Sequence, residues 1–485
     1  MAGDAVTRHG MPEAPGRPEG GAVAWHLAGY THRPLQAHSR PRLDLNGLWA
    51  FRTDPDDQGM ERDDWRGEGE PAEGETPWSR MRVPAHWQVE GLQYQGVAWY
   101  SRRFPPYRVK EGARLFLVFE GVDYSARVWV NGVEVGSHEG GYFGFEFDVT
   151  DVVSADHDNV VVVRVDCPMN SHPEAKRVVK GAISHWDCIP IRQAPLPGFT
   201  DDPWYPHPIL NPAGIWAPVY LEERPPVHIR AVTVTASLLG GDQVAEVKAR
   251  VRVRNSTATA QPVVLRVRIA PANFDDPVVV EARRPATLQP GEDEVELTLL
   301  LQQPRLWWSW DHGFPHLYRL EAWLHDGSRP VDPSGGPGGE RASAGDGVWD
   351  GVSTRFGIRE IRRGPNWEIY LNGRRIFLRG TNYLSRLFMS TATPELYDRH
   401  LAMVRELGMN LIRVFAHVEL PYFYERCDEL GILVYQDLPF QWGYEPSPEV
   451  RATALDLTDQ VITALRNHPS IVIWCCHSEP RLHDW

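Results

Sequence analysis

A short apolar run close to residue 485 leads into a single carboxylate. Ile471–Trp474 is branched and apolar without alternation, which is typical of a buried strand. Glu479 follows this run. In a parallel barrel, the side chains at the carboxyl ends of the strands carry the chemistry. The pattern indicates acid–base chemistry that needs two carboxylates, and we expect residues 1–485 to supply only one of them.

The elements that would position Glu479 alternate between strand and helix after Trp367. A capping residue followed by proline opens two of the predicted helices, at Thr393–Pro394 and at Ser447–Pro448. A third predicted helix starts at Pro421 and stops at Gly431. The predicted strands cover residues 376–378, 411–415, 432–435 and 471–474. Strict alternation with short links predicts a parallel sheet, and four strands match half of an eight-stranded barrel, which typically needs about 250 residues.

The preceding residues predict two β-rich domains. Residues 38–226 contain short apolar runs and an Asn131–Gly132 hairpin signal, which favour a β-sandwich. Residues 227–357 contain roughly seven alternating strands, as in an immunoglobulin-like β-sandwich. We predict a disordered tail over residues 1–37, and long loops over 170–211 and 326–347. The remaining residues, 358–485, form the partial barrel.

Composition excludes several classes of function. The net charge of −14 argues against binding of a phosphate backbone, and therefore against a nucleic-acid partner. The five cysteines show no disulfide-framework spacing. We see no signal peptide and no stretch of about 20 apolar residues that would span a membrane. We therefore expect a soluble, cytoplasmic protein that does not act at a membrane.

Short motifs along nearly the whole chain resemble those of glycoside hydrolase family 2. Each motif alone is weak, but their order and spacing are specific. The motifs are Leu45-Asn-Gly-Leu-Trp-Ala-Phe51, Val83-Pro-Ala-His-Trp87, Trp99-Tyr-Ser-Arg-Arg-Phe104, Gly214-Ile-Trp-Ala-Pro-Val219, Leu306-Trp-Trp308, Phe356-Gly-Ile-Arg359, Gly380-Thr-Asn382, Asn410-Leu-Ile-Arg413 and Asn467-His-Pro-Ser470. The resemblance implies a jelly-roll sugar-binding-like domain, an immunoglobulin-like domain and the first half of a TIM barrel.

The resemblance also implies a retaining mechanism in which Glu479 is the general acid/base. The family nucleophile is a second Glu after strand seven, which we do not find in residues 1–485. Retention requires the two carboxyl groups to lie about 5–5.5 Å apart. The acid must hold its proton near neutral pH, and we expect Trp474, Cys475 and Cys476 to contribute apolar walls that raise its pKa.

Other residues are assigned to substrate binding by their position and by the resemblance. Arg413 corresponds to the arginine that steadies the active-site carboxylates, with a salt bridge at the bottom of the barrel as the alternative. Ser478 stands where the family usually has an asparagine that binds the sugar 2-hydroxyl, so we expect reduced or shifted activity. The remaining candidates are Asn382 and His417 just past the first and second strands, Asp437 and Trp442 after the third strand, and Trp186 with Asp187 in the long loop of the first domain.

No cofactor is predicted, and no metal site. Cys475, Cys476 and His477 are neighbours, but adjacent residues of a strand point to opposite faces and cannot converge on a metal ion. The sequence does not determine the oligomeric state, and a homo-oligomer stays among the alternatives.

Two classes of function remain. The first is an exo-acting β-glycosidase that cleaves a β-linked carbohydrate. Trp474–Cys475 and Tyr435-Gln-Asp437 resemble β-mannosidases, while a β-galactosidase would show a His-Glu pair after the first barrel strand and a β-glucuronidase is harder to separate. The second is a truncated, inactive fragment that binds carbohydrate through its β-domains. We expect residues 1–485 alone to be inactive, because they hold one catalytic carboxylate.

Overall fold

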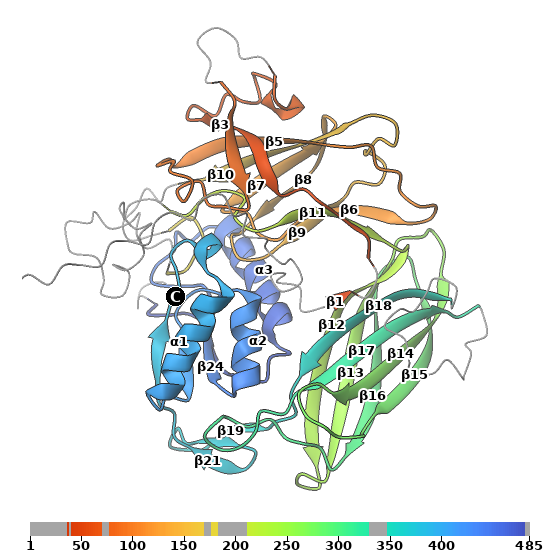
Figure 1. Cartoon of the computed structure of the whole chain (residues 1–485), viewed down its shortest axis with the longest axis vertical. Coiled ribbons are helices and arrows are strands. Elements are labelled where there is room, and N and C mark those ends of the chain that lie inside the picture. Colours follow the sequence, from red (N-terminus) through yellow and green to blue (C-terminus); the bar gives the residue numbers. More distant parts are fainter. Residues whose placement is uncertain are drawn as a thin grey trace, which may run out of the picture.

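The computed structural model describes residues 36–37, 40–69, 77–168, 176–182, 211–328 and 347–480. Trp186, Asp187 and most of the two predicted long loops lie outside these residues. Figure 1 shows three parts: an orange β-sandwich at the top, a green β-sandwich at the lower right, and a blue α/β part at the lower left.

The first sandwich consists of two antiparallel sheets that share one apolar core. The predicted hairpin is confirmed, since Val130 pairs with Val133 and both turn residues, Asn131 and Gly132, have positive φ. The six-stranded sheet has the order β4 (Ser79–Val83), β3 (Gly47–Asp54), β5 (Gly96–Phe104), β10 (Asn159–Cys167), β7 (Ser125–Val130), β8 (Val133–Glu139). The four-stranded sheet has the order β2 (Arg42–Asp44), β11 (Val219–Arg224), β6 (Arg114–Phe119), β9 (Phe145–Asp148). A 3-10 turn, Asp64–Arg66, lies in the connection between β3 and β4.

The second sandwich contains the seven predicted strands, β12 to β18, and one strand that the sequence did not predict. Gln36 and Ala37 form β1, which pairs antiparallel with β18. The predicted disordered tail over residues 1–37 is therefore wrong at its end, because backbone pairing with a distant strand orders two residues that have no local strand signal. One sheet has the order β12 (Val227–Leu239), β13 (Val244–Asn255), β16 (Gly291–Gln302). The other sheet has the order β1 (Gln36–Ala37), β18 (Val348–Phe356), β17 (Tyr318–Asp326), β14 (Gln261–Pro271), β15 (Val280–Leu288).

The α/β part confirms the predicted half-barrel. Its four parallel strands are neighbours in sequence order: β22 (Gly380–Tyr383), β23 (Leu411–Val414), β24 (Leu433–Asp437), β25 (Ile471–Cys475). The helices are α1 (Pro394–Glu406), α2 (Pro421–Leu430) and α3 (Pro448–Leu465), each starting at its predicted proline. The Thr393 and Ser447 side chains accept from the amides of Leu396 and Val450 as N-caps. Among the described residues, no helix is both long and apolar enough to cross a membrane.

Two predictions for the barrel strands are wrong. The first barrel strand is Gly380–Tyr383, whereas the predicted strand at 376–378 overlaps a separate antiparallel sheet of β19 (Ile361–Arg363), β20 (Ile369–Leu371) and β21 (Arg374–Ile376). The last strand is also not fully buried, since Ile471 is buried but Trp474 is 38% exposed. Among the described residues β25 pairs only with β24, so one of its edges has no neighbouring strand.

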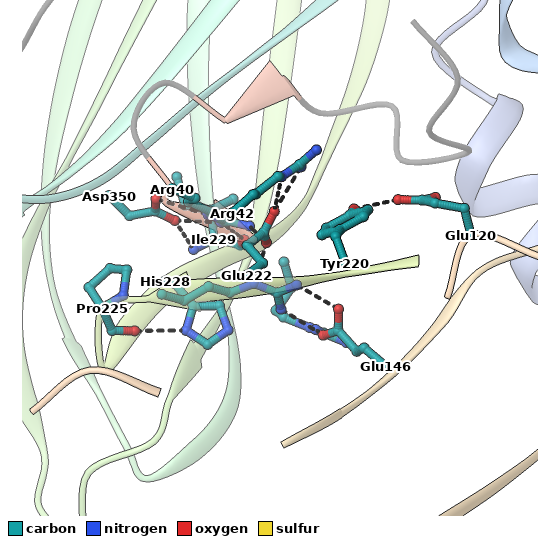
Figure 2. Close-up of polar contacts among 12 residues, drawn as sticks. Arg40, Arg42, Glu120, Glu146, Tyr220, Glu222, Pro225, His228, Ile229 and Asp350 are labelled. Carbon is teal, nitrogen blue, oxygen red and sulfur yellow. Dashed lines mark hydrogen bonds and ion pairs between the residues drawn. The ribbon is translucent and has the colours of Figure 1, made fainter. Parts of the chain in front are cut away.

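A buried charge cluster joins the two sandwiches (Figure 2). Glu222 of β11 accepts hydrogen bonds from Arg40, Arg42 and Arg224 at distances of 2.6–3.3 Å. Arg40 also binds Asp350 of β18 at 2.7 Å and the carbonyl of Ile229 in β12 at 2.7 Å. Because one guanidinium contacts strands of both domains, the cluster fixes the second sandwich against the first.

Candidate active site

The carboxyl ends of the four parallel strands bring the candidate residues together. The register aligns Asn382 of β22 with Arg413 of β23, and Arg413 with Tyr435 of β24. Asn382 is exposed and lies within its strand, so the prediction that placed it after the first strand is wrong by position. Arg413 is half-buried in the centre of the group.

Arg413 and Asp437 form the central ion pair. The guanidinium donates to both carboxylate oxygens of Asp437, with Nε to Oδ1 at 3.1 Å and Nη2 to Oδ2 at 2.8 Å. Burial acts to lower the pKa of Arg413, but hydrogen bonding to Asp437 and its negative charge outweigh this and raise that pKa. The Ala416 amide, after β23, also donates to Oδ2 of Asp437 at 3.2 Å. Asp437 thus holds the guanidinium and the end of a neighbouring strand in a fixed geometry.

Ser478 belongs to the same group. Its side chain is 1% exposed, and its hydroxyl oxygen accepts from Nη2 of Arg413 at 3.2 Å. The backbone of Ser478 pairs with the chain after β24, because its amide donates to the Phe440 carbonyl at 2.9 Å and its carbonyl accepts from the Trp442 amide at 3.1 Å. Backbone hydrogen bonds therefore join the chain after β25 and the chain after β24 into one structural unit.

Glu479 is exposed at the end of this unit and contacts Trp442. The indole Nε1 of Trp442 donates to Oε2 of Glu479 at 2.8 Å. Both residues have left-handed backbones, with φ of 60° at Trp442 and 51° at Glu479. Such backbone conformations are strained for residues other than glycine and recur at functional sites. The sequence placed both residues near the site, but it gave no sign of the hydrogen bond between them.

The predicted apolar walls around Glu479 do not occur as expected. Trp474 is 38% exposed and Cys476 is also exposed, while Cys475 is half-buried. These side chains therefore do not enclose the carboxylate within the described residues. The aromatic side chain that contacts Glu479 is Trp442.

His417 lies in a buried cluster shortly after the end of β23. Its side chain has no exposed surface, and Nδ1 donates to the Phe415 carbonyl at 3.0 Å. Nε2 lies 2.6 Å from Oε1 of Glu419, which is also fully buried. Burial acts to raise the pKa of Glu419, but the charge of His417 and hydrogen bonds from His417, Ser385 and Tyr397 lower it.

Sequence reasoning missed Glu419, Ser385 and Tyr397. Glu419 accepts 2.6 Å hydrogen bonds from the hydroxyls of both Ser385 and Tyr397. The His-x-Glu spacing after the second strand was the available signal. The cluster ties the loops that follow β22 and β23 to α1.

No group of three or more His, Cys, Asp or Glu with the arrangement of metal ligands occurs among the described residues. Trp186 and Asp187 lie outside these residues, so their assignment to substrate binding stays a prediction.

Comparison with known families places the three parts of the chain in one family. Residues 86–217 match the model described as "Glycosyl hydrolase 2 galactose-binding domain-like". Residues 227–334 match "Glycosyl hydrolases family 2", and residues 364–484 match "Glycosyl hydrolases family 2, TIM barrel domain". The chain belongs to glycoside hydrolase family 2. The resemblance inferred from the sequence motifs is confirmed.

Relatives within family 2 carry more than one activity in their names. A beta-glucuronidase of Bacteroides fragilis is 26% identical over 459 residues, which are 91% of this chain and 56% of the relative. A beta-mannosidase B of Thermothelomyces thermophilus is 28% identical over 413 residues, which are 80% of this chain and 44% of the relative. The chain spans about half the length of the curated relatives that it matches.

Solved structures of family 2 proteins share the fold. The Beta-D-Mannosidase from Dictyoglomus thermophilum superimposes with a TM-score of 0.67 and 23% sequence identity, covering 90% of this chain and 52% of that chain. The order of jelly-roll-like domain, immunoglobulin-like domain and partial TIM barrel is therefore that of the family.

Proposed function

We propose that the chain carries the acid/base half of a retaining exo-β-glycosidase site, with Glu479 as the general acid/base. The observation that supports this most directly is the placement of Glu479. It lies exposed after the fourth parallel strand, its backbone is left-handed, and the Trp442 indole orients its carboxylate. Arg413 pairs with Asp437 and donates to the hydroxyl of Ser478, the residue that precedes Glu479.

In this mechanism Glu479 protonates the leaving oxygen and later removes a proton from the attacking water. A second carboxylate attacks the anomeric carbon. We assign that role to none of the described residues. Arg413 presents an obligate cation beside the reacting centre, where negative charge on the substrate or the nucleophile would be stabilised. Asn382 is exposed and supplies a neutral group that can hydrogen-bond sugar hydroxyls, whereas the Ser478 hydroxyl is buried against Arg413.

For the substrate we propose a β-mannoside, and a β-glucuronide as the second candidate. The similarity to a beta-mannosidase B and the motifs at Tyr435–Asp437 and Trp474–Cys475 support the first choice. The beta-glucuronidase relative, at 26% identity against 28% for the beta-mannosidase B, supports the second. Beta-galactosidases also occur among the relatives, but the chain has no His-Glu pair after its first barrel strand.

Replacing the carboxylate tests the assignment. The protein expressed from the complete reading frame that contains residues 1–485 is assayed with p-nitrophenyl β-mannoside, β-glucuronide and β-galactoside. Glu479→Gln should lower kcat by about 10²–10⁴-fold on the substrate that is turned over, because general acid–base catalysis contributes that much. The matched control is Glu395→Gln, which changes an exposed carboxylate at the start of α1 and should leave kcat unaltered.

Azide separates an acid/base from a nucleophile. In Glu479→Ala, azide needs no general base, so it should restore turnover and give a glycosyl azide of retained configuration. A 2-deoxy-2-fluoro glycoside should label a carboxylate other than Glu479. Covalent labelling of Glu479 itself, or full activity of Glu479→Gln, would show that the proposed role is wrong.

A further inference from the structure

A short segment of the first domain lies against the strand ends of the barrel. We call residues 176–182 the docking segment. The Ala182 amide donates to the Ala416 carbonyl at 2.8 Å, just after β23. The Glu445 amide, in the connection between β24 and α3, donates to the Lys176 carbonyl at 2.9 Å, and Lys176 forms a parallel bridge with Tyr444. The docking segment therefore contacts the chain that follows two of the four parallel strands.

The Lys176 side chain fastens the connection that carries Trp442. Lys176 is 2% exposed, and its ammonium donates to the Gln441 carbonyl at 2.8 Å and to the Gly181 carbonyl at 3.2 Å. It also lies 5.1 Å from the centre of the Tyr444 ring. Burying an ammonium is costly unless hydrogen bonds compensate it, and here two backbone carbonyls accept from it. Here the fixed groups lie on both sides of Trp442.

The other end of the docking segment is anchored in the first sandwich. Lys180 is 1% exposed, and its ammonium lies 3.0 Å from Oδ1 of Asp123 and donates to the Pro212 carbonyl at 2.6 Å. The Tyr142 hydroxyl donates to the Lys180 carbonyl at 2.7 Å. These contacts hold the segment on the sandwich, so the segment is bonded both to the first sandwich and to the barrel part.

The close approach of the two parts requires glycine at one position. Gly181 has φ of +56°, and a Cβ there would lie 1.8 Å from the Ala416 carbonyl oxygen. Any side chain would push the docking segment away from the end of β23. Glycine at position 181 thus permits direct backbone contact between the docking segment and the chain after β23.

We propose that Lys176 is a positioning residue for the acid/base. It holds the backbone on both sides of Trp442, Trp442 donates to Glu479, and the orientation of the Glu479 carboxylate thus depends on a residue of the first domain. This inference rests on the proposed function of Glu479, and it assigns the first domain a part in proton transfer.

Kinetics on two leaving groups test the proposal in the protein made from the complete reading frame. Lys176→Met should lower kcat/KM at least about 10-fold for an aryl glycoside with a poor leaving group, which needs protonation. For the dinitrophenyl glycoside, which leaves without an acid, kcat/KM should change less than about 3-fold. Lys110→Met is the matched control, because Lys110 is a surface lysine of the same domain, and it should alter neither value. An equal loss on both substrates would indicate a merely structural role and overturn the proposal.

A double-mutant cycle tests whether Lys176 acts through Trp442. In a Trp442→Phe background, Lys176→Met should change kcat/KM for the poor leaving group less than about 2-fold. A full additional loss in that background would overturn the proposed route. If Lys176→Met does not accumulate as folded protein, Lys176→Gln replaces it, since one N–H can still reach the Gln441 carbonyl.

Hydrogen exchange gives a readout that does not depend on turnover. Lys176→Met should speed exchange of the Trp442, Glu445 and Ser478 amides, and Lys110→Met should not. Unchanged exchange would overturn the positioning inference. If the wild-type protein hydrolyses no glycoside and exchange still rises as expected, the proposed function fails while the structural link from Lys176 to the Glu479 region stands.

Discussion

At the scale of single residues, three strand ends share an unusual backbone. Ala416, Trp442 and Glu479 follow β23, β24 and β25, and their φ values are 49°, 60° and 51°. A left-handed conformation costs a residue other than glycine of the order of 1–3 kcal/mol, so surrounding contacts must enforce it. The Asp437 carboxylate, the Ser478 carbonyl and the docking segment supply those contacts. Three of the nine non-glycine residues with positive φ among the described residues thus lie where the proposed chemistry takes place.

Ser478 gives the first prediction at this scale. Its hydroxyl accepts from Arg413, and the resemblance to family 2 expects an asparagine there that binds the sugar 2-hydroxyl. Ser478→Asn supplies a longer amide that can reach the sugar, and this contact strengthens in the transition state. We expect kcat on the preferred aryl glycoside to rise about 3- to 10-fold, corresponding to a hydrogen bond of about 1 kcal/mol.

Steady-state kinetics on both proteins measure the effect of this change. Ser447→Asn, at the N-cap of α3, is the control, because asparagine is an equally good cap. An unchanged kcat in Ser478→Asn would remove the argument that serine limits the activity.

At the scale of elements, the strand ends are held together by charge. Asp437 has no exposed surface, and it joins Arg413 of β23 to its own strand β24 and to the Ala416 amide. The apolar residues of the strands determine which face of the sheet is buried, but they do not determine the distance between neighbouring strand ends. The ion pair sets that spacing.

Asp437→Asn tests the role of this pair. The substitution keeps the shape but removes the charge that compensates Arg413, and an uncompensated partly buried cation is destabilising. We expect the free energy of unfolding of the barrel part to fall by about 1–3 kcal/mol. Urea unfolding followed by hydrogen exchange of barrel peptides measures it. Asp459→Asn changes an exposed position of α3 and should move the midpoint very little, so equal shifts in both variants would contradict the prediction.

At the scale of the whole molecule, contacts between the parts involve residues that carry the family motifs. Asn467 precedes β25, and its side chain accepts from the Val234 amide at 3.0 Å and donates to the Val232 carbonyl at 2.8 Å in the second sandwich. One apolar cluster also contains Trp216 and Tyr142 of the first sandwich together with Phe388 and Leu396 of the barrel part. The sandwiches thus form part of the support for the strand ends.

The charge cluster between the two sandwiches makes stability depend on pH (Figure 2). His228 is fully buried, and its Nδ1 donates to the Pro225 carbonyl at 3.0 Å, so the neutral ring has its lone pair on Nε2. Among the described residues Nε2 has no hydrogen-bond partner. Burial, followed by the charges of Arg224 and Arg40, lowers the pKa of His228 from 6.5 to about 3.

The sign of the pH effect follows from this shift. Between about pH 6.5 and pH 3 the unfolded chain binds a proton at His228 and the folded chain does not, so stability falls as the pH falls. The slope contributed by one such proton approaches about 1.4 kcal/mol per pH unit. His228→Asn keeps a donor for the Pro225 carbonyl and cannot titrate, so its free energy of unfolding should fall less steeply between pH 6 and pH 4.

Urea unfolding at a series of pH values measures the two slopes. The control is His157→Asn, which removes an exposed histidine of the first sandwich and should keep the wild-type slope. Parallel curves for the wild type and His228→Asn would contradict the predicted low pKa.

The local signals of the sequence predicted the elements well. Prolines at the first helical turn and the glycine after Leu430 determined where helices begin and end, because these residues restrict the backbone whatever surrounds them. The strand before Glu479, and the position of Glu479 at the carboxyl end of that strand, were predicted from another local pattern, the apolar run Ile471–Trp474. Strand Gln36–Ala37 was missed, since it forms only by pairing with β18.

By itself, then, the sequence determined the family, the order of the three parts and the placement of Glu479 at a strand end, because each depends on a local pattern of apolar, capping and turn residues. Only the tertiary structure decided what contacts Glu479. The Trp442 indole, the burial of His417 and the position of Lys176 depend on register and packing between segments far apart in the chain. Such contacts carry no local signal, because a side chain chooses its partner only after the backbone elements have been brought together.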